Sequence, residues 1–247
     1  QKFSLFLKYG LFWIIFFLCT KTLFLIYQFD QSAELSWMEI TKIYLYGFRM
    51  DLSATGYLLL IPGLILTASP LFPSRWLKNI FGSYTILMGA FLCLITTLDL
   101  ELFRHWGYRF DISPLKYIGK DTLSSTTWTT DVFLIVVFAA VSAATVLLYR
   151  KLVKPSFQLI KDNNWFHAPL FLFATAFLIL PIRGSLDIGP MNTGTVFFHK
   201  KNPFANQSAI NLFWNFGDSV TKSLEVESYP ENFLNKDLTS TSFQSLY

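Results

Sequence analysis

The sequence predicts an all-α, polytopic membrane protein with five transmembrane helices and additional amphipathic helices at the membrane interface. The chain is rich in apolar residues: 53% of its 247 residues are hydrophobic and 27 are phenylalanine, whereas only 15% are charged. These apolar residues are gathered in long blocks, several of which reach the ~20 residues that a helix needs to cross the hydrocarbon core. Blocks of this length without polar alternation favour helices over the strands of a closed barrel.

The five blocks cover about residues 5–27, 52–71, 80–98, 132–149 and 165–182. The first could be a signal peptide, since Lys2 and Lys8 lie near its start. Its apolar stretch is too long and bulky for that, and no small-x-small cleavage site follows, so we predict a retained helix. Cys19 and Cys93 fall inside blocks and are interpreted as small core residues rather than a disulfide framework.

The charges between the blocks predict an orientation. With the N-terminus inside, the inner segments carry eight basic residues and one acid, Asp162: the basic residues are Lys2, Lys8, Arg75, Lys78, Arg150, Lys151, Lys154 and Lys161. The outer loops, residues 28–51 and 99–131, carry six basic and nine acidic residues. Because short cytoplasmic loops are enriched in Lys and Arg, we expect a cytoplasmic N-terminus and an extracytoplasmic C-terminus.

Two outer segments carry helical signals. Ser36 followed by Glu39 fits a capping box, and it predicts a short surface helix leading into the second crossing. Farther on, Glu101 can meet Arg104 or His105 one turn later.

Residues 184–247 are predicted to form an extracytoplasmic linker. Asn202 and Pro203 give a cap and first-turn signal, and an apolar stripe follows at helical spacing, which predicts an interfacial helix over about 203–224. The alternative for this stripe is a core face that packs on another domain. The last stretch, residues 230–247, turns polar.

A set of charged residues is predicted to gather at the outer end of the bundle. The planar guanidinium group of arginine can donate two parallel hydrogen bonds to a phosphate or a carboxylate. This rim could therefore contact lipid headgroups or dock an outer domain. The alternative is structural, with ion pairs such as Arg49 to Glu101, or Arg104 to Glu101 or Asp99, holding loops in place. The predicted rim consists of Arg49, Asp51, Asp99, Glu101, Arg104, Arg109 and Arg183.

Lys21 interrupts the first apolar block, about 9 Å from its outer end at ~1.5 Å per residue. One interpretation is that its ammonium reaches the outer headgroups. The other is that it faces the bundle and pairs with an acid such as Asp51 or Asp99.

The residues give no catalytic centre. The three histidines, His105, His167 and His199, are scattered, and no metal-ligand spacing, nucleophile–base pair or phosphate-binding loop is present. The net charge of +4 reflects the inner anchors, and no basic patch with interleaved aromatics indicates nucleic-acid binding. A transporter or channel is disfavoured, since Lys21 stands nearly alone as a mid-membrane charge and no inverted repeat is visible.

Four segments together resemble the membrane half of the lipoteichoic acid synthase-like family. They are "GFRMDLSATGYLLLIP", "DLELFRHWGYRFDISPLKYI", "IRGSLDIGP" and "NPFANQSAINLFWNF", and the resemblance covers most of the chain in order and spacing. This family comprises phosphoglycerol transferases and related membrane-bound sulfatase-like proteins of the alkaline phosphatase superfamily. Lys21 has no place in the family pattern.

The resemblance implies a function that the residues alone do not. Five helices would carry an outer catalytic domain, which uses a threonine nucleophile and a divalent metal, usually manganese. That domain would move a phosphoglycerol or phosphoethanolamine group from a phospholipid to an envelope acceptor. No position in this chain matches the nucleophile or metal-ligand motifs, so the catalytic domain is expected beyond Tyr247. The location implied is the bacterial cytoplasmic (inner) membrane, with phospholipid and the protein's own catalytic domain as partners, and a homo-oligomer or a membrane complex as possibilities.

Two alternatives remain open from the sequence. The chain could be a non-enzymatic membrane scaffold subunit, whose short surface helices serve as docking elements. It could also be the anchor of a sulfatase-like hydrolase rather than of a transferase.

Overall fold

The structure, a computed structural model, describes residues 2–71, 73–116, 128–159, 167–184 and 191–227. Over these ranges every regular element is a helix, which confirms the predicted all-α class.

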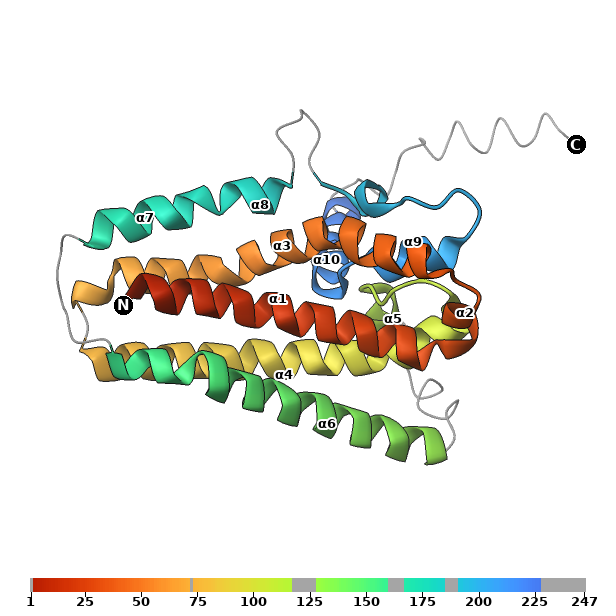
Figure 1. Ribbon diagram of the computed structural model, residues 1–247, viewed down its shortest axis with the longest axis horizontal. Coiled ribbons are helices and arrows are strands. Elements are labelled where there is room, and N and C mark those ends of the chain that lie inside the picture. The colour runs from red at the N-terminus through yellow and green to blue at the C-terminus, as the bar shows by residue number, and fades with distance from the viewer. Residues whose placement is uncertain (1, 72, 117–127, 160–166, 185–190, 228–247) are drawn as a thin grey trace, which may run out of the picture.

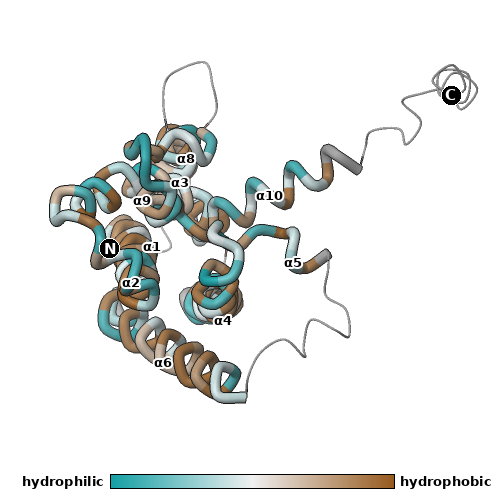
Figure 2. The backbone as a smooth tube through the Cα atoms, turned by 90° about the vertical axis from the view of Figure 1, so that its right-hand side faces the viewer, coloured by the Kyte–Doolittle hydropathy of each residue, from teal (hydrophilic) through white to brown (hydrophobic). Residues whose placement is uncertain are grey.

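Four helices in the described ranges are long and apolar enough to cross a membrane. They are α1 (Lys2–Tyr27), α3 (Trp37–Thr67), α4 (Ser74–Trp106) and α6 (Trp128–Leu152). All four run along the long axis of the molecule (Figure 1). The first, third and fourth predicted blocks lie within α1, α4 and α6, whereas the second, residues 52–71, extends past the end of α3 at Thr67 into η1 (Ser69–Leu71). Figure 2 shows mostly hydrophobic colour along α6, as expected for a helix that meets lipid or core on every side.

The fifth predicted block, residues 165–182, is shorter in the structure than a spanning helix. It forms α7 (His167–Phe177) and α8 (Ile179–Arg183), which follow each other along α3 (Figure 1); residues 165 and 166 lie outside the described residues. The approach to α3 is close, because a Cβ added at Gly63 would collide with the Thr175 side chain. The fifth block is therefore helical in the structure, but it forms two short helices.

The N-terminal part of α3 differs from the prediction. The capping box is confirmed: the Ser36 side chain accepts a hydrogen bond from the Glu39 amide, and the Glu39 carboxylate accepts one from the Ser36 amide. The prediction of a separate surface helix ahead of a crossing that begins at residue 52 is wrong, because α3 is one helix of 31 residues from Trp37 onward. Gly47 and Ser53 are residue types that can end or begin a helix, but α3 continues through both of them without a break.

Pro62 lies inside α3 and has no amide to donate to the Leu58 carbonyl one turn earlier. The Tyr84 hydroxyl of α4 donates to that carbonyl instead, at 3.0 Å. A hydrogen bond from a neighbouring helix thus satisfies the backbone group that the proline leaves free, as membrane helices require.

Short elements connect and cover the long helices. They are α2 (Phe29–Ala33), η1 (Ser69–Leu71), α5 (Ser113–Lys116), η3 (Lys154–Leu159), η4 (Thr193–Val196), α9 (Pro203–Ala209) and α10 (Leu212–Glu227). We call residues 191–227, which hold η4, α9 and α10, the C-terminal arm. It packs beside the first half of α3, and α10 runs across the bundle with its end directed away from it (Figures 1 and 2).

The predicted helix over residues 203–224 is confirmed at its start. The Asn202 side chain accepts a hydrogen bond from the Ala205 amide, and Pro203 occupies the first turn. The helix is not continuous, however, because Ile210 has extended backbone and separates α9 from α10. Residues 185–190 and 228–247 of the predicted linker lie outside the described residues.

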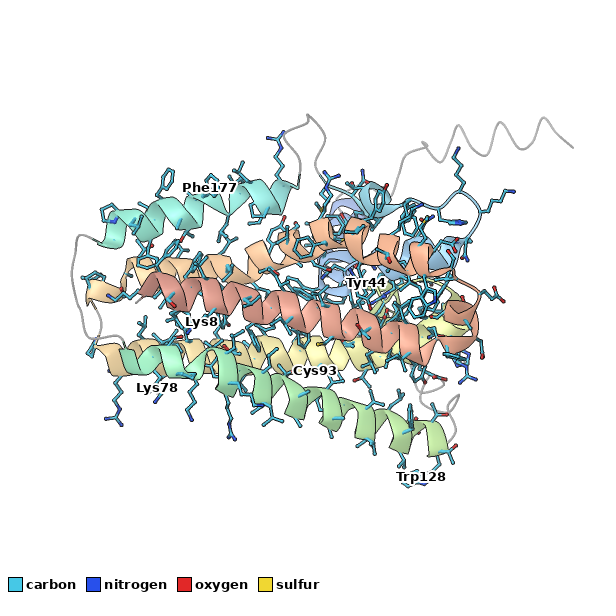
Figure 3. All side chains as sticks on the ribbon, viewed as in Figure 1. Lys8, Tyr44, Lys78, Cys93, Trp128 and Phe177 are labelled. Carbon is cyan, nitrogen blue, oxygen red and sulfur yellow. The ribbon has the colours of Figure 1, made fainter. Side chains whose placement is uncertain are left out.

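We name the two ends of the bundle by their residues. The arm end contains the end of α1 at Tyr27, the start of α3 at Trp37, the end of α4 at Trp106 and the start of α6 at Trp128. The basic end contains Lys78 together with Arg150 and Lys154. Figure 3 shows Lys78 and Trp128 at opposite ends of the molecule, with Cys93 between them.

Candidate functional site

Lys21 of α1 points into the bundle, not toward solvent. Its Nζ lies 2.7 Å from Oδ2 of Asp51 on α3, and the two side chains are 3% and 0% exposed. Pairing with Asp51 is therefore confirmed, and the alternative in which Lys21 reaches the headgroups is wrong. Gly47 lies one turn before Asp51, and a Cβ there would collide with both the Lys21 ammonium and the Ala209 carbonyl oxygen.

The second oxygen of Asp51 binds the C-terminal arm. Asn211 Nδ2 donates to Asp51 Oδ1 at 2.8 Å, and both residues are buried. Asn211 also accepts a hydrogen bond from the Trp214 amide at 3.1 Å, so the same amide side chain caps α10. One carboxylate thus joins α1, α3 and the junction between α9 and α10.

A second ion pair lies close by. Arg109 Nη2 is 3.0 Å from Asp99 Oδ2 of α4, with side chains 6% and 1% exposed. The other Asp99 oxygen accepts a hydrogen bond from the Phe110 amide at 2.7 Å. The Arg109 guanidinium also lies over the Phe24 ring, 4.0 Å from its centroid, where a cation–π contact adds to the attraction.

Together these two pairs form what we call the charge cluster: Lys21, Asp51, Asp99 and Arg109. Its formal charges cancel. Burial lowers the pKa of the Arg109 guanidinium, while the negative charges of Asp99 and Asp51 raise it. Burying ion pairs carries a large desolvation cost, so the cluster is not by itself a source of net stability. Removing one member, however, would leave an uncompensated charge inside the bundle.

Four polar side chains of the arm occur at a spacing of four, and each binds either Asp51 or the backbone of residues 109–112. Gln207 accepts from the Arg109 amide at 3.3 Å, and Asn211 binds Asp51. Asn215 donates to the Phe110 carbonyl at 3.0 Å, and the Ser219 hydroxyl accepts from the Ile112 amide at 3.0 Å. Sequence reasoning missed this polar stripe because it followed only the apolar residues of the same segment; the constant spacing of four was the available signal.

Arg49 is exposed and does not pair with Glu101 as one alternative predicted. Its Nη2 donates to the Gly184 carbonyl at 2.9 Å. One turn later Ser53 donates to the Ile182 carbonyl at 2.7 Å. The physical reason is that helix ends leave carbonyls unpaired, and those at the end of α8 lie within reach of α3. Arg183 itself is exposed beside this contact.

Glu101 and Arg104 line an open cavity at the arm end. Glu101 accepts from the Tyr27 hydroxyl at 2.5 Å and lies 3.1 Å from His105 Nε2, which confirms the predicted contact one turn later. The cavity has a volume of about 630 Å³, lies between α1, α4 and α6, and is lined in part by Tyr27, Gln28, Asp30, Glu101, Arg104 and Phe133.

The predicted rim therefore divides into two groups. Asp51, Asp99 and Arg109 are buried and bind other parts of the protein, whereas Arg49, Glu101, Arg104 and Arg183 are exposed or half-buried. In the parts of the chain that are described, no group of three or more His, Cys, Asp or Glu is placed to hold a metal ion. Comparisons with protein-family models, curated proteins and solved structures found no significant match to this chain.

Proposed function

We propose that this chain is the membrane domain of a lipoteichoic acid synthase-like transferase, which moves a phosphoglycerol or phosphoethanolamine group from a phospholipid to an envelope acceptor. The observation that carries the proposal is the attachment of the C-terminal arm. Asp51 binds both Lys21 and Asn211 inside the bundle. An ion pair and a hydrogen bond therefore attach the segment after α8 to α1 and α3. Such an attachment suits an arm that must hold a catalytic domain at a constant height above the membrane.

The topology that goes with this function has five crossings, with α7 and α8 as the fifth. Basic residues at one end of the bundle, among them Lys78, Arg150 and Lys154, support a cytoplasmic location for that end in a bacterial inner membrane. The arm end is then extracytoplasmic, where the donor headgroups and the envelope acceptor are found.

The cavity at the arm end supports a role in presenting the donor lipid. Arg104 supplies a guanidinium group that can bind a phosphate. Asp30 and Glu101 supply carboxylates that can accept hydrogen bonds from an ammonium or hydroxyl group. Apolar side chains such as Phe133 form another part of the wall, as a lipid-facing opening requires. The catalytic residues are not assigned to this chain.

The test uses the full-length gene product in proteoliposomes with headgroup-labelled phosphatidylglycerol or phosphatidylethanolamine and an acceptor. We expect Arg104→Gln to lower the transfer rate by roughly tenfold, the effect of losing one charge-assisted hydrogen bond. Lys222→Gln is the matched control, since Lys222 is a cation on the arm whose side chain is 63% exposed.

Each outcome has a distinct meaning. Absence of transfer from either lipid by the wild-type protein would refute the transferase. Release of the headgroup without an acceptor would identify the sulfatase-like hydrolase instead. Normal transfer by the Arg104→Gln variant would show that the cavity does not present the donor lipid. A scaffold subunit would show neither transfer nor hydrolysis and would co-purify with a separate enzyme.

A further inference from the structure

A second cavity lies between α4 and α6, away from the charge cluster. Its volume is about 350 Å³, within the range of ~300–1,000 Å³ common for small-ligand sites. Small and apolar residues form most of its wall, among them Gly82, Ile86, Gly89, Ala90 and Val146. We call this cavity the α4–α6 groove.

The glycines of the groove are not filled by tight packing between α4 and α6. Glycine and alanine on a membrane helix usually mark a site of close helix packing. Here a Cβ added at Gly82 would meet nothing within 4 Å, and one at Gly89 would only reach ordinary contact with Thr145, at 3.7 Å. The missing side chains therefore leave space that another molecule can fill.

The wall of the groove offers few free polar groups. The Thr85 hydroxyl donates to the Phe81 carbonyl, and the Thr145 hydroxyl donates to the Val141 carbonyl. Among the described groove residues, Ser142 has a buried hydroxyl without a partner. A molecule in the groove would thus contact mainly hydrocarbon, which suits an acyl chain and not a polar solute.

The groove opens onto cations at the basic end. Arg150 and Lys154 belong to its lining, and an adjoining cavity of about 420 Å³ shares Gly82 and Lys154 with it and adds Lys78. No acidic residue is among the described side chains that line either cavity. The groove and the adjoining cavity together follow α4 from Lys78 to Cys93, about 22 Å at ~1.5 Å per residue and more than half of a ~30 Å hydrocarbon core.

We propose that the α4–α6 groove binds an anionic phospholipid of the leaflet at the basic end. One acyl chain lies in the groove, and the phosphate-bearing headgroup lies against Lys78, Arg150 and Lys154. Charge complementarity selects the occupant, because three cations without a lining acid favour a net negative headgroup over a zwitterionic one. The site is separate from the arm-end cavity and does not depend on the transferase proposal.

Native mass spectrometry of the delipidated full chain tests this site. Phosphatidylglycerol and phosphatidylethanolamine with identical acyl chains are added in turn, and the lipid-bound fraction is measured. We expect preferential retention of phosphatidylglycerol. Arg150→Gln with Lys154→Gln should lower this retention by about fivefold for each cation removed. The matched control is Arg75→Gln with Lys151→Gln, since neither residue lines the two cavities.

Filling the groove tests the acyl-chain part separately. Gly82→Leu and Ala90→Leu should each lower retention of both lipids, whereas Ala144→Leu on the exposed face of α6 should not. The two filling variants are independent, so a folding defect in one leaves the other informative. Equal retention of the two lipids, equal losses in the control double variant, or normal binding in both filled variants would each overturn the proposal. So would a dimer that forms in the wild type and disappears on filling, because the groove would then hold a second copy.

Discussion

The charge cluster and the basic end of the bundle use charge in opposite ways. In the charge cluster, the side chains of Lys21 and Asp51 are 3% and 0% exposed, and every member has an opposite partner inside the protein. At the basic end, Lys78 and Arg150 are exposed and line cavities that contain no acid among their described residues. Charges of the first kind join segments of the protein, and charges of the second kind are available to the membrane. Substitutions in the charge cluster and at the basic end should therefore differ greatly in their effect on stability.

The largest effect is expected from Asp51→Ala. This change leaves the Lys21 ammonium buried without a partner and removes the acceptor of Asn211 Nδ2. Loss of one member of a buried pair costs about 3–5 kcal/mol of the free energy of unfolding. Thermal unfolding of the detergent-solubilised protein measures this loss.

A double variant distinguishes the loss of the ion-pair attraction from the cost of leaving one buried charge without a partner. Lys21→Met with Asp51→Leu removes both charges at once and should recover much of the loss, because no unpaired ion remains in the bundle. If Asp51→Ala unfolds at the wild-type temperature, the cluster does not hold the arm in place.

Gly47→Ala is expected to have the next largest effect. The added methyl group would collide with the Lys21 ammonium and the Ala209 carbonyl oxygen, and the second is backbone that cannot rotate away. Overpacking of this kind costs about 1–3 kcal/mol. Gly82→Ala is the control within α4, since its Cβ would meet open space, and it should leave stability unchanged or raise it by up to ~1 kcal/mol. Equal unfolding temperatures for the two variants would contradict the close approach at Gly47.

A smaller effect is expected from Tyr84→Phe. The change removes the donor to the Leu58 carbonyl that Pro62 leaves free. Hydrogen bonds between membrane helices contribute about 0.6 kcal/mol on average and up to ~1.7 kcal/mol, so we expect a loss of about 1 kcal/mol. Tyr57→Phe, on a half-exposed part of α3, removes a hydroxyl without this contact and serves as the control in the same unfolding assay.

Much of the helical fold could be predicted from the sequence, because it depends on local patterns. The long apolar blocks, the capping box at Ser36 and the start of α9 at Asn202 are all visible over a few residues. The sequence predicts Asp51 or Asp99 as the partner of Lys21, since a charge inside the membrane must be paired. Two features could not be predicted. Arg49 binds the Gly184 carbonyl, a backbone group that every residue carries, and no glycine or proline marks the break at Ile210.

The smallest effect is expected from Lys222→Ala on α10. Lys222 Nζ lies 2.6 Å from Asp218 Oδ2, about as close as Lys21 lies to Asp51, yet its side chain is 63% exposed instead of 3%. Water and salt screen such a pair, and holding a long side chain in one position costs entropy, so its contribution is only about 0–1 kcal/mol. We expect a change in unfolding temperature near the limit of measurement, and one that disappears in 1 M salt, where the screening length falls to ~3 Å. The effect of Asp51→Ala should persist in the same salt, because ions do not reach the buried pair. A loss of stability in Lys222→Ala as large as that in Asp51→Ala would show that distance, and not burial, determines what these ion pairs contribute.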